Sequence, residues 1–261
     1  MNACRRGLLA AAASWVCTGG SAAATLPELI ARLRPSVLPV GTFSATASPR
    51  FGFRGTGFVV GDGMLVATNF HVLPPSAELA TGPGMAVRTP SGELRLAKVL
   101  ASDRDHDLAL LKIDGAPLPA VALDGANSAR EGQDIALMGF PIGGALGFSP
   151  VTHRGIVASV TQVALQAPTA QQLDARAITR LREGNFEVLQ LDATAYPGNS
   201  GGPVFDAGSG VVLAVVNMVL VKGSRESALS SPTGISYAIP VRHLLALLAQ
   251  VAQTTQAPQT R

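Results

Sequence analysis

Three short segments of the sequence contain residue types that could carry nucleophilic catalysis. In the first, Gly198–Pro203 (GNSGGP), Ser200 stands between glycines. Glycine permits backbone angles that other residues avoid and lets a substrate approach closely, so a serine in this setting suits a nucleophile on a tight turn. The glycines also leave backbone N–H groups unobstructed, and such groups can stabilise the oxyanion of an acyl transfer.

The other two segments supply a base and an acid. His71 follows a β-like run in ATNFHV, and Asp107 opens the apolar run DLALLK. Each also has a plain structural interpretation, since a lone histidine is often a hydrogen-bonded core residue and an aspartate before a strand is often a turn cap. If the three side chains meet, His71 can take the proton of Ser200 while Asp107 holds the imidazole in place.

The order of these residues along the chain distinguishes two folds. A G-x-S-x-G serine alone also fits the nucleophile elbow of an α/β-hydrolase, which needs the order serine, acid, histidine. Only one histidine, His243, follows Ser200, and the 61 residues that remain of 261 are too few for the rest of such a sheet. The order His71, Asp107, Ser200 is instead that of chymotrypsin-type enzymes.

The elements that must position these residues are short β segments separated by Gly, Pro, Asp and Asn. The chain has 28 glycines and 18 prolines, and this pattern predicts an all-β barrel or sandwich. Apolar residues at helical spacing predict helices over Val241–Val251 and about Leu173–Arg182. The predicted strands are Leu38–Thr42, Gly55–Val60, Met64–Thr68, Met85–Thr89, Glu93–Leu100, Leu108–Ile113, Asp134–Phe140, Gly155–Val163, Phe186–Leu191, Pro203–Phe205, Val211–Val219 and Ile235–Ile239.

Composition and charge narrow the possible functions. The chain is 47% hydrophobic and 14% charged, which is a globular composition. Lys+Arg total 20 and Asp+Glu 17, so the charge gives no case for nucleic acid or an anionic membrane as partner. No apolar run reaches the roughly 20 residues of a transmembrane helix. No metalloprotease, phosphate-loop or calcium-loop motif is found, and we expect no metal and no cofactor.

The N-terminal residues 1–24 have the pattern of a secretory signal peptide. Paired arginines precede the apolar stretch Leu8–Val16 and the small residues Ala22–Ala24, which predicts cleavage near Ala24 and Thr25 as the first mature residue. We therefore expect an exported protein, periplasmic or secreted, by the general or the twin-arginine route. Both cysteines lie in this segment, so the mature chain has no disulfide, thiol nucleophile or cysteine zinc site.

Five blocks between about Val37 and Leu248 resemble, in order, those of chymotrypsin-fold serine proteases of the bacterial HtrA (Deg) type. This resemblance implies two six-stranded antiparallel β-barrels with the site between them and a C-terminal helix. Residues 25–125 would hold the first barrel, 126–250 the second barrel and the helix, and 251–261 a polar tail. The blocks are GTGFVVGDGMLVATNFHVL, DLALLKI, PVTHRGIVASV, LQLDATAYPGNSGGPVF and GISYAIP.

The resemblance and the chemistry together assign the catalytic roles. Ser200 Oγ would attack a peptide carbonyl, His71 would transfer its proton to the leaving amine, and Asp107 would hold the imidazole and stabilise its charged form. The backbone N–H groups of Gly198 and Ser200, with Asn199 N–H as a third donor, would bind the oxyanion.

The same alignment predicts the residues that contact the substrate. Thr194, six positions before Ser200, falls at the base of the primary specificity pocket, and Ile235 falls on its wall. No acid stands at the base, so we expect a small or medium aliphatic P1 side chain instead of Lys or Arg. Val216 and Asn217 lie in Val215–Val219, the edge against which the substrate backbone would pair as a strand.

One feature differs from the digestive proteases of this fold, and two differ from typical HtrA proteins. Asn199 replaces the aspartate that pairs with a newly cut N-terminal amine in digestive proteases, so we expect no such activation step and expect the loop Leu165–Gly184 to order the site. We expect no PDZ domain after the C-terminal helix. Trimer formation, which uses N-terminal aromatic residues in the resembling family, has only Phe43 and Phe51 as weak candidates here.

Other polar residues are expected to be structural. His106 and His243 should be exposed, the latter on the solvent face of the terminal helix. His153 should be structural or face the substrate, and Glu28 and Arg32 should form a solvated helix pair.

Three functions are compatible with these residues. The first is an exported serine endopeptidase that cleaves unfolded or exposed polypeptide segments. The second is a catalytically silent peptide binder or chaperone that keeps the protease fold. The third is a hydrolase of small esters with the same triad, which peptide-versus-ester kinetics would separate from the first.

Overall fold

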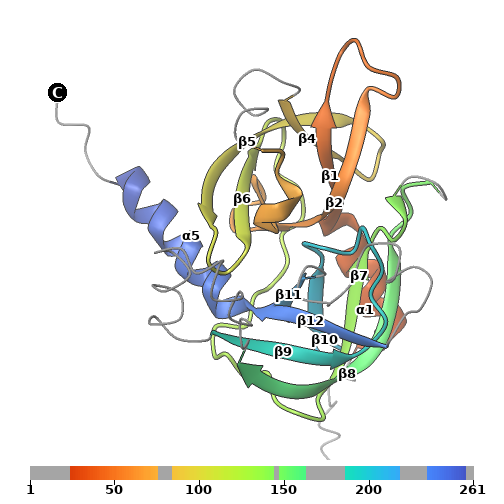
Figure 1. The fold of residues 1–261 in the computed structure, drawn as a ribbon, viewed down its shortest axis with the longest axis vertical. Coiled ribbons are helices and arrows are strands. Elements are labelled where there is room, and N and C mark those ends of the chain that lie inside the picture. Colours follow the sequence, from red (N-terminus) through yellow and green to blue (C-terminus); the bar gives the residue numbers. More distant parts are fainter. Residues whose placement is uncertain (1–23, 76–83, 144–146, 163–185, 218–233, 257–261) are drawn as a thin grey trace, which may run out of the picture.

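The computed structural model describes residues 24–75, 84–143, 147–162, 186–217 and 234–256. They form two closed six-stranded antiparallel β-barrels, one above the other in Figure 1, which confirms the predicted architecture. The strand order is β1-β2-β3-β6-β5-β4 in the first barrel and β10-β11-β12-β9-β8-β7 in the second. The predicted signal peptide, apart from Ala24, and the predicted helix near Leu173–Arg182 lie outside the described residues.

The first barrel contains the first six strands, and β6 shows why a strand that faces both the barrel interior and the second barrel is almost entirely apolar. Leu108 and Leu110 belong to an apolar cluster shared with the second barrel, whereas Ala109, Leu111 and Ile113 belong to the cluster inside the first. Alternate side chains of a strand point to opposite faces, so a strand buried on both faces is apolar almost throughout. The strands are β1 (Val37–Phe43), β2 (Phe51–Val60), β3 (Leu65–Thr68), β4 (Gly84–Arg88), β5 (Leu94–Asp103) and β6 (Leu108–Ile113).

The second barrel repeats this plan. In β11, Val212 and Val215 join the shared cluster, while Leu213, Ala214 and Val216 join the cluster inside the second barrel. The two barrels therefore share one apolar contact zone, which fixes them against each other. The strands are β7 (Asp134–Gly139), β8 (Val151–Gln162), β9 (Glu187–Asp192), β10 (Pro203–Asp206), β11 (Val212–Asn217) and β12 (Ile235–Pro240).

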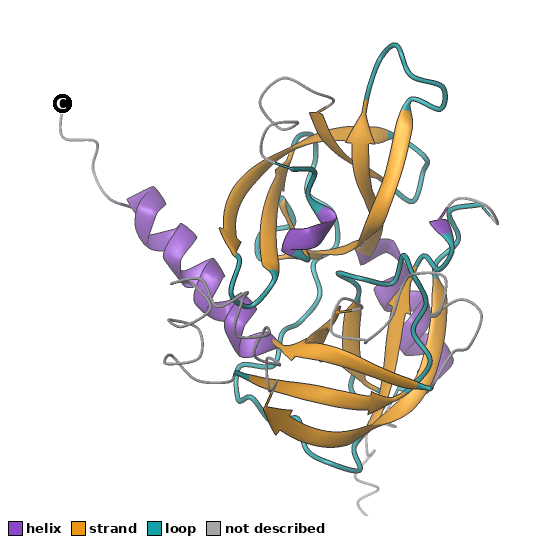
Figure 2. Ribbon diagram, viewed as in Figure 1, coloured by secondary structure: helices purple, strands orange, loops and turns teal. Residues whose placement is uncertain are grey.

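Among the described residues, two α-helices flank the barrels, and short 3₁₀ turns, strands and loops make up the rest (Figure 2). Helix α5 (Val241–Gln256) follows β12 directly, extends beyond its predicted end, and packs against β5, β6, β11 and β12. Its buried residues Leu244 and Leu247 join the shared cluster. No helix among the described residues is long and apolar enough to cross a bilayer.

Helix α1 (Leu26–Leu33) corrects one expectation. Glu28 accepts the Thr25 backbone N–H at 2.8 Å and so caps the helix N-terminus, while Arg32 donates to the carbonyl of Ser209 at 2.8 Å. The predicted Glu28–Arg32 pair is therefore wrong, because each side chain has a partner elsewhere. A short 3₁₀ turn, η1 (Arg34–Ser36), leads from α1 into β1.

Candidate active site

The histidine and the aspartate meet because β3 pairs with β6. Thr68, at the end of β3, lies opposite Ala109 of β6, so the residues after β3 and before β6 are neighbours. His71 lies there in the 3₁₀ turn η2 (Phe70–Val72), and Asp107 in the turn before β6. His71 Nδ1 is 2.6 Å from Asp107 Oδ2, and the His71 backbone N–H donates to Asp107 Oδ1 at 2.8 Å.

Asp107 is held from several sides. Its φ of +52° lies in the left-handed region, which is uncommon for a residue other than glycine. Its carbonyl oxygen accepts the Phe70 N–H at 3.1 Å and the Asn69 side-chain amide at 3.0 Å. Asn217 Nδ2, at the end of β11, donates to Asp107 Oδ2 at 2.8 Å. The second barrel thus helps to orient an acid that belongs to the first.

The Ser200 turn requires glycine on both sides of the serine. Gly198 has a φ of +104° and Gly201 a φ of +84°. A Cβ on Gly198 would lie 2.3 Å from the Phe140 carbonyl oxygen, and one on Gly201 would lie 2.2 Å from the Thr56 carbonyl oxygen. Both the backbone angles and the close contacts exclude a larger residue. Ser200 itself is 6% exposed.

The backbone N–H groups of this turn fall into two classes. Asn199 N–H donates to the Tyr196 carbonyl at 2.9 Å, and Gly201 N–H donates to the Val216 carbonyl at 3.0 Å. For Gly198 N–H and Ser200 N–H, no acceptor occurs among the described residues. Two amides are therefore available to an oxyanion, and the Asn199 amide of the predicted trio is not.

The Ser200 turn lies directly beside the segment Asn69–Val72, which contains His71. A Cβ on Gly201 would be 3.0 Å from the backbone nitrogen of Asn69, two residues before His71, and one on Gly55 would lie between Val72 and the Ser200 carbonyl. Within the described part of the chain, no hydrogen bond joins Ser200 to His71. Such bonds are often long in unliganded enzymes and shorten when substrate binds.

The predicted specificity residues have different environments. Thr194 is half-buried, and Ile235 is 45% exposed. Val216 is buried and bonds through its backbone to Gly201 and Gly202, and the Asn217 side chain is committed to Asp107. The rest of the predicted substrate edge, residues 218–219, lies outside the described residues.

His106 and His243 form a second, covered cluster, so the expectation that both are exposed is wrong. His106 Nδ1 is 2.6 Å from Asp103 Oδ2, and its ring stacks on His243 with centroids 3.8 Å apart. Phe186 packs edge-on against both rings. His243 Nε2 is buried without a hydrogen-bond partner, and burial, with smaller contributions from His106 and Arg242, lowers the pKa of His243 to about 4.

His153 lies on β8, half-buried, as expected for a structural or substrate-facing residue. Its ring is 5.7 Å from that of Tyr196, which precedes the nucleophile turn. Burial lowers the pKa of His153, and its Nε2 has no hydrogen-bond partner. His153 is therefore a neutral imidazole near pH 7 that lies beside the Tyr196 ring.

The segment after β7 is anchored to the first barrel by aromatic packing. Phe148 contacts the rings of Phe51, Phe53 and Phe140 with centroids 5.6, 5.8 and 6.5 Å away, and Arg88 lies 4.9 Å above its ring centre. Phe51, a weak candidate for a trimer contact, is therefore buried within its own chain.

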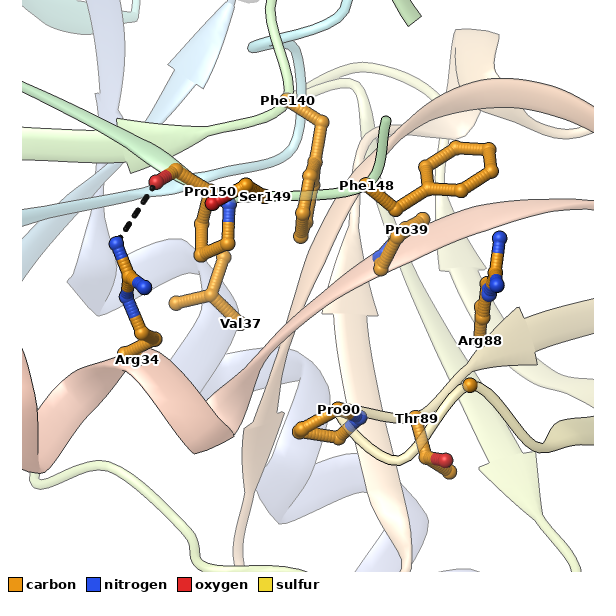
Figure 3. A pocket seen from close by; sticks show the side chains of 11 residues that line it. Arg34, Val37, Pro39, Arg88, Thr89, Pro90, Phe140, Phe148, Ser149 and Pro150 are labelled. Carbon is orange, nitrogen blue, oxygen red and sulfur yellow. Dashed lines mark hydrogen bonds between the residues drawn. The ribbon is translucent and has the colours of Figure 1, made fainter. Parts of the chain in front are cut away.

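A cavity of about 270 Å³ lies beside this cluster (Figure 3). Its lining includes Arg34, Arg88, Phe140 and Pro150, and Arg34 donates to the Pro150 carbonyl at 3.5 Å. Neither His71 nor Ser200 lines it, so the cavity is separate from the candidate active site. No group of three metal-ligating side chains was found among the described residues.

The family model for the trypsin-like peptidase domain matches residues 55–215. A probable periplasmic serine endoprotease, DegP-like, of Rickettsia prowazekii is 31% identical over 204 residues, which cover 78% of this chain and 34% of that protein. A serine protease Do-like HtrB of Bacillus subtilis is 27% identical over 248 residues, 88% of this chain and 48% of that protein. The chain thus spans between a third and a half of these relatives.

Solved structures agree with the fold. An HtrA-type protease AlgW with decapeptide superposes with a TM-score of 0.64 at 22% identity, covering 88% of this chain and 68% of that one. The serine endoprotease from Yersinia pestis gives a TM-score of 0.62 at 22% identity, covering 88% and 67% of the two chains. At this identity the likeness concerns the fold alone.

Proposed function

Since the chain belongs to the trypsin-like peptidase domain family, we propose that it is a serine endopeptidase that cleaves peptide bonds through an acyl-enzyme. One observation carries the proposal. The His71–Asp107 pair of the first barrel stands beside the glycine-bounded Ser200 turn of the second, where two backbone amides have no acceptor among the described residues.

The proposed reaction begins with the attack of Ser200 Oγ on a peptide carbonyl. His71 Nε2, the ring nitrogen that does not face Asp107, takes the hydroxyl proton and then passes it to the leaving amine. Asp107 stabilises the imidazolium that forms between these steps. Water then attacks the acyl-enzyme with His71 again as the base, which releases the acid product and restores Ser200.

The oxyanion of both tetrahedral intermediates would be bound by the N–H groups of Gly198 and Ser200. This set is smaller than the sequence prediction, because the Asn199 amide donates within the turn. Donors of this kind are worth roughly 10²–10³ in rate each. Their fixed direction matters more than their number, since a preorganised donor need not reorient as charge develops.

The substrate is proposed to be an extended or unfolded polypeptide segment with a small or medium aliphatic P1 residue. The names of both relatives support a protein substrate, since one is a serine endoprotease and the other a serine protease. The first is also called periplasmic, which supports an exported setting. Thr194 and Ile235 support the aliphatic preference, because neither carries a charge that would favour Lys or Arg at P1. We also propose that the chain is exported and that its signal peptide is cleaved near Ala24.

Activation by a new N-terminal amine is not part of the proposal. Asn199 is fully buried, and both its side-chain oxygen and its side-chain nitrogen lack hydrogen-bond partners. A neutral amide in this position gains no ion pair from an incoming ammonium group, and the ammonium group would lose its hydration there.

The test uses the full chain and a fluorophosphonate probe, with cleavage of unfolded casein measured in parallel. We expect label on Ser200, loss of label in Ser200→Ala and His71→Ala, and casein cleavage that follows the label. A folded wild-type chain that neither takes the label nor cleaves casein would contradict the proposal.

The competing function is a silent peptide binder that keeps the same fold, and the same experiment separates it from the endopeptidase. Binding of an aliphatic peptide without labelling or turnover would support that function. Hydrolysis of a small ester without casein cleavage would instead point to an esterase.

A further inference from the structure

We infer that Thr56 is a positioning residue that fixes the oxyanion turn to the barrel carrying His71. The inference rests on the proposed function and assigns a role to a residue outside the predicted site. Thr56 lies on β2 and is completely buried. A buried threonine on a strand is ordinarily a packing residue, but the polar atoms of Thr56 bond to segments of the other barrel.

The Thr56 hydroxyl links two segments of the second barrel. It donates to the Gly198 carbonyl at 2.6 Å and accepts the Phe140 backbone N–H at 3.1 Å. Its backbone N–H donates to the Ser200 carbonyl at 2.9 Å. One residue of the first barrel therefore binds the carbonyls on both sides of the nucleophile turn.

These two bonds set the directions of two peptide planes around Ser200, Gly198–Asn199 and Ser200–Gly201. Because a peptide is planar and trans, a carbonyl aimed at Thr56 turns the N–H of the same peptide to the opposite side. The Gly198 carbonyl thereby directs Asn199 N–H toward Tyr196, and the Ser200 carbonyl directs Gly201 N–H toward Val216. The Gly198 and Ser200 amides belong to the adjoining peptides, Pro197–Gly198 and Asn199–Ser200, and have no acceptor among the described residues, as an oxyanion site requires. Because the peptides on the C-terminal side of both donors are held by Thr56, the turn has less freedom to direct these amides elsewhere.

Thr56 is also connected to the histidine side of the site. Its carbonyl accepts the Thr68 hydroxyl at 2.7 Å, and Thr68 ends the strand that leads to His71. Crowding keeps Thr56 in place, since a Cβ on Gly201 would lie 2.2 Å from its carbonyl oxygen and one on Gly139 would lie 3.0 Å from its hydroxyl. The base and the oxyanion donors are thus located relative to one residue.

Only the hydroxyl group separates this role from packing. Valine has nearly the same shape but cannot donate to the Gly198 carbonyl, which would then be a half-buried acceptor without its donor. Serine keeps the hydroxyl and loses one methyl group. The two substitutions therefore test opposite parts of the side chain.

The experiment compares Thr56→Val and Thr56→Ser in the full chain by fluorophosphonate labelling rate and by kcat and KM on a fluorogenic peptide with Val at P1. We expect Thr56→Val to lower kcat and the labelling rate by about 10- to 100-fold with KM changed less than about threefold, because a misdirected donor weakens transition-state binding selectively. Thr56→Ser should stay within about fivefold of wild type.

Thr89→Val is the matched control. Thr89 is also buried, and its hydroxyl contacts Ser91 and the Glu93 carbonyl in the β4–β5 turn, away from Ser200. This variant should lose stability without losing kcat. A loss of kcat in Thr89→Val equal to that in Thr56→Val would overturn the inference.

Other outcomes also decide the question. If folded Thr56→Val has the labelling rate and kcat of wild type, Thr56 is a packing residue and the inference is wrong. If Thr56→Val does not fold, Thr56→Ala and Thr56→Ser differ by the hydroxyl alone, and equal kcat in these two contradicts the inference. A wild-type chain without His71-dependent label contradicts the proposed function itself, and this assignment with it.

Discussion

Two histidine–aspartate pairs in the first barrel have nearly the same geometry. His71 and His106 each place Nδ1 2.6 Å from an aspartate oxygen, and each donates its backbone N–H to the other oxygen of that aspartate, at 2.8 and 3.0 Å. The side chains of both histidines are 27% exposed. By local geometry alone, either pair could serve a nucleophile.

The difference lies in how each pair is made and in what faces it. Asp103 and His106 are three residues apart, so one turn of chain forms that pair, whereas Asp107 meets His71 only after β3 and β6 have paired. The ring of His106 is covered by His243 and an aromatic neighbour. His71 instead borders the Ser200 turn. A histidine–aspartate pair is therefore a common local structure, and the opposite barrel makes one of them a candidate site.

The largest expected effect separates the two histidines. His71→Ala should lower kcat/KM on a fluorogenic peptide by about 10⁴-fold or more, because no other base stands beside Ser200 in the part of the chain that the structure describes. His106→Ala should keep kcat/KM within about threefold and reduce stability instead. Steady-state kinetics and thermal unfolding of both variants make the comparison. Equal losses of activity in the two would show that the second cluster supports catalysis.

The aspartates should differ in the same way but by less. Asp107→Asn should lower kcat by about 10⁴-fold, because an amide can hold His71 in the wrong tautomer. Asp103→Asn should leave kcat within about threefold, since its histidine faces no reacting group. The measurement is kcat with matched circular dichroism spectra. Wild-type kcat in folded Asp107→Asn would contradict the role proposed for Asp107.

The strand plan was predictable because its signals are local. All twelve predicted strands are present, and the resemblance to HtrA-type proteases is confirmed by the relatives. Two strand starts were predicted four residues too late. β2 begins at Phe51, where it pairs with Phe43 across a hairpin, and β8 begins at Val151 opposite Gly139. Glycine and polar residues early in these strands conceal the alternating pattern.

The candidate site was predictable only where a motif or chain order marks it. His71, Asp107 and Ser200 could be found in this way, whereas Thr56 gives no signal in the sequence, because its contacts come from another barrel. His243 was misplaced for a related reason. The helical pattern puts it opposite the apolar face, but the β5–β6 turn that carries His106 covers that side of α5.

A smaller effect is expected from the link between the barrels at Asp107. Asn217→Ala removes the donor to Asp107 Oδ2 and should lower kcat about tenfold, because the acid loses its hold from the second barrel. Gln133→Ala is the matched control, since Gln133 also donates an amide to a carboxylate, Asp206, at 2.7 Å. That control should not change kcat. Equal kcat in both variants would show that Asn217 does not orient Asp107.

The smallest expected effect is a change of stability with pH, and it arises from His243, which stacks on His106. The pKa of His243 is about 4 in the folded protein against an ordinary value of 6.5, because burial, His106 and Arg242 disfavour its charged form more than Asp103 and Glu187 favour it. Above about pH 6.5 the group is neutral in both states and has no effect. Between about pH 6.5 and 4 the unfolded chain binds the extra proton, so the free energy of unfolding falls as the pH falls.

This loss should amount to about 1–2 kcal/mol, less than the full shift implies, because His243 is only half-buried and solvent screens its charge. Urea unfolding at several pH values would measure it, and His243→Gln should flatten the slope between about pH 4 and 6.5. His153→Gln is a necessary comparison, since burial also lowers the pKa of His153 and adds a slope of the same sign. The His71–Asp107 pair should be unaffected, so kcat at pH 7.5 should stay at the wild-type value in both variants. An unchanged slope in His243→Gln would mean that the folded protein protonates His243 as readily as the unfolded chain does, so that His243 does not cause the slope.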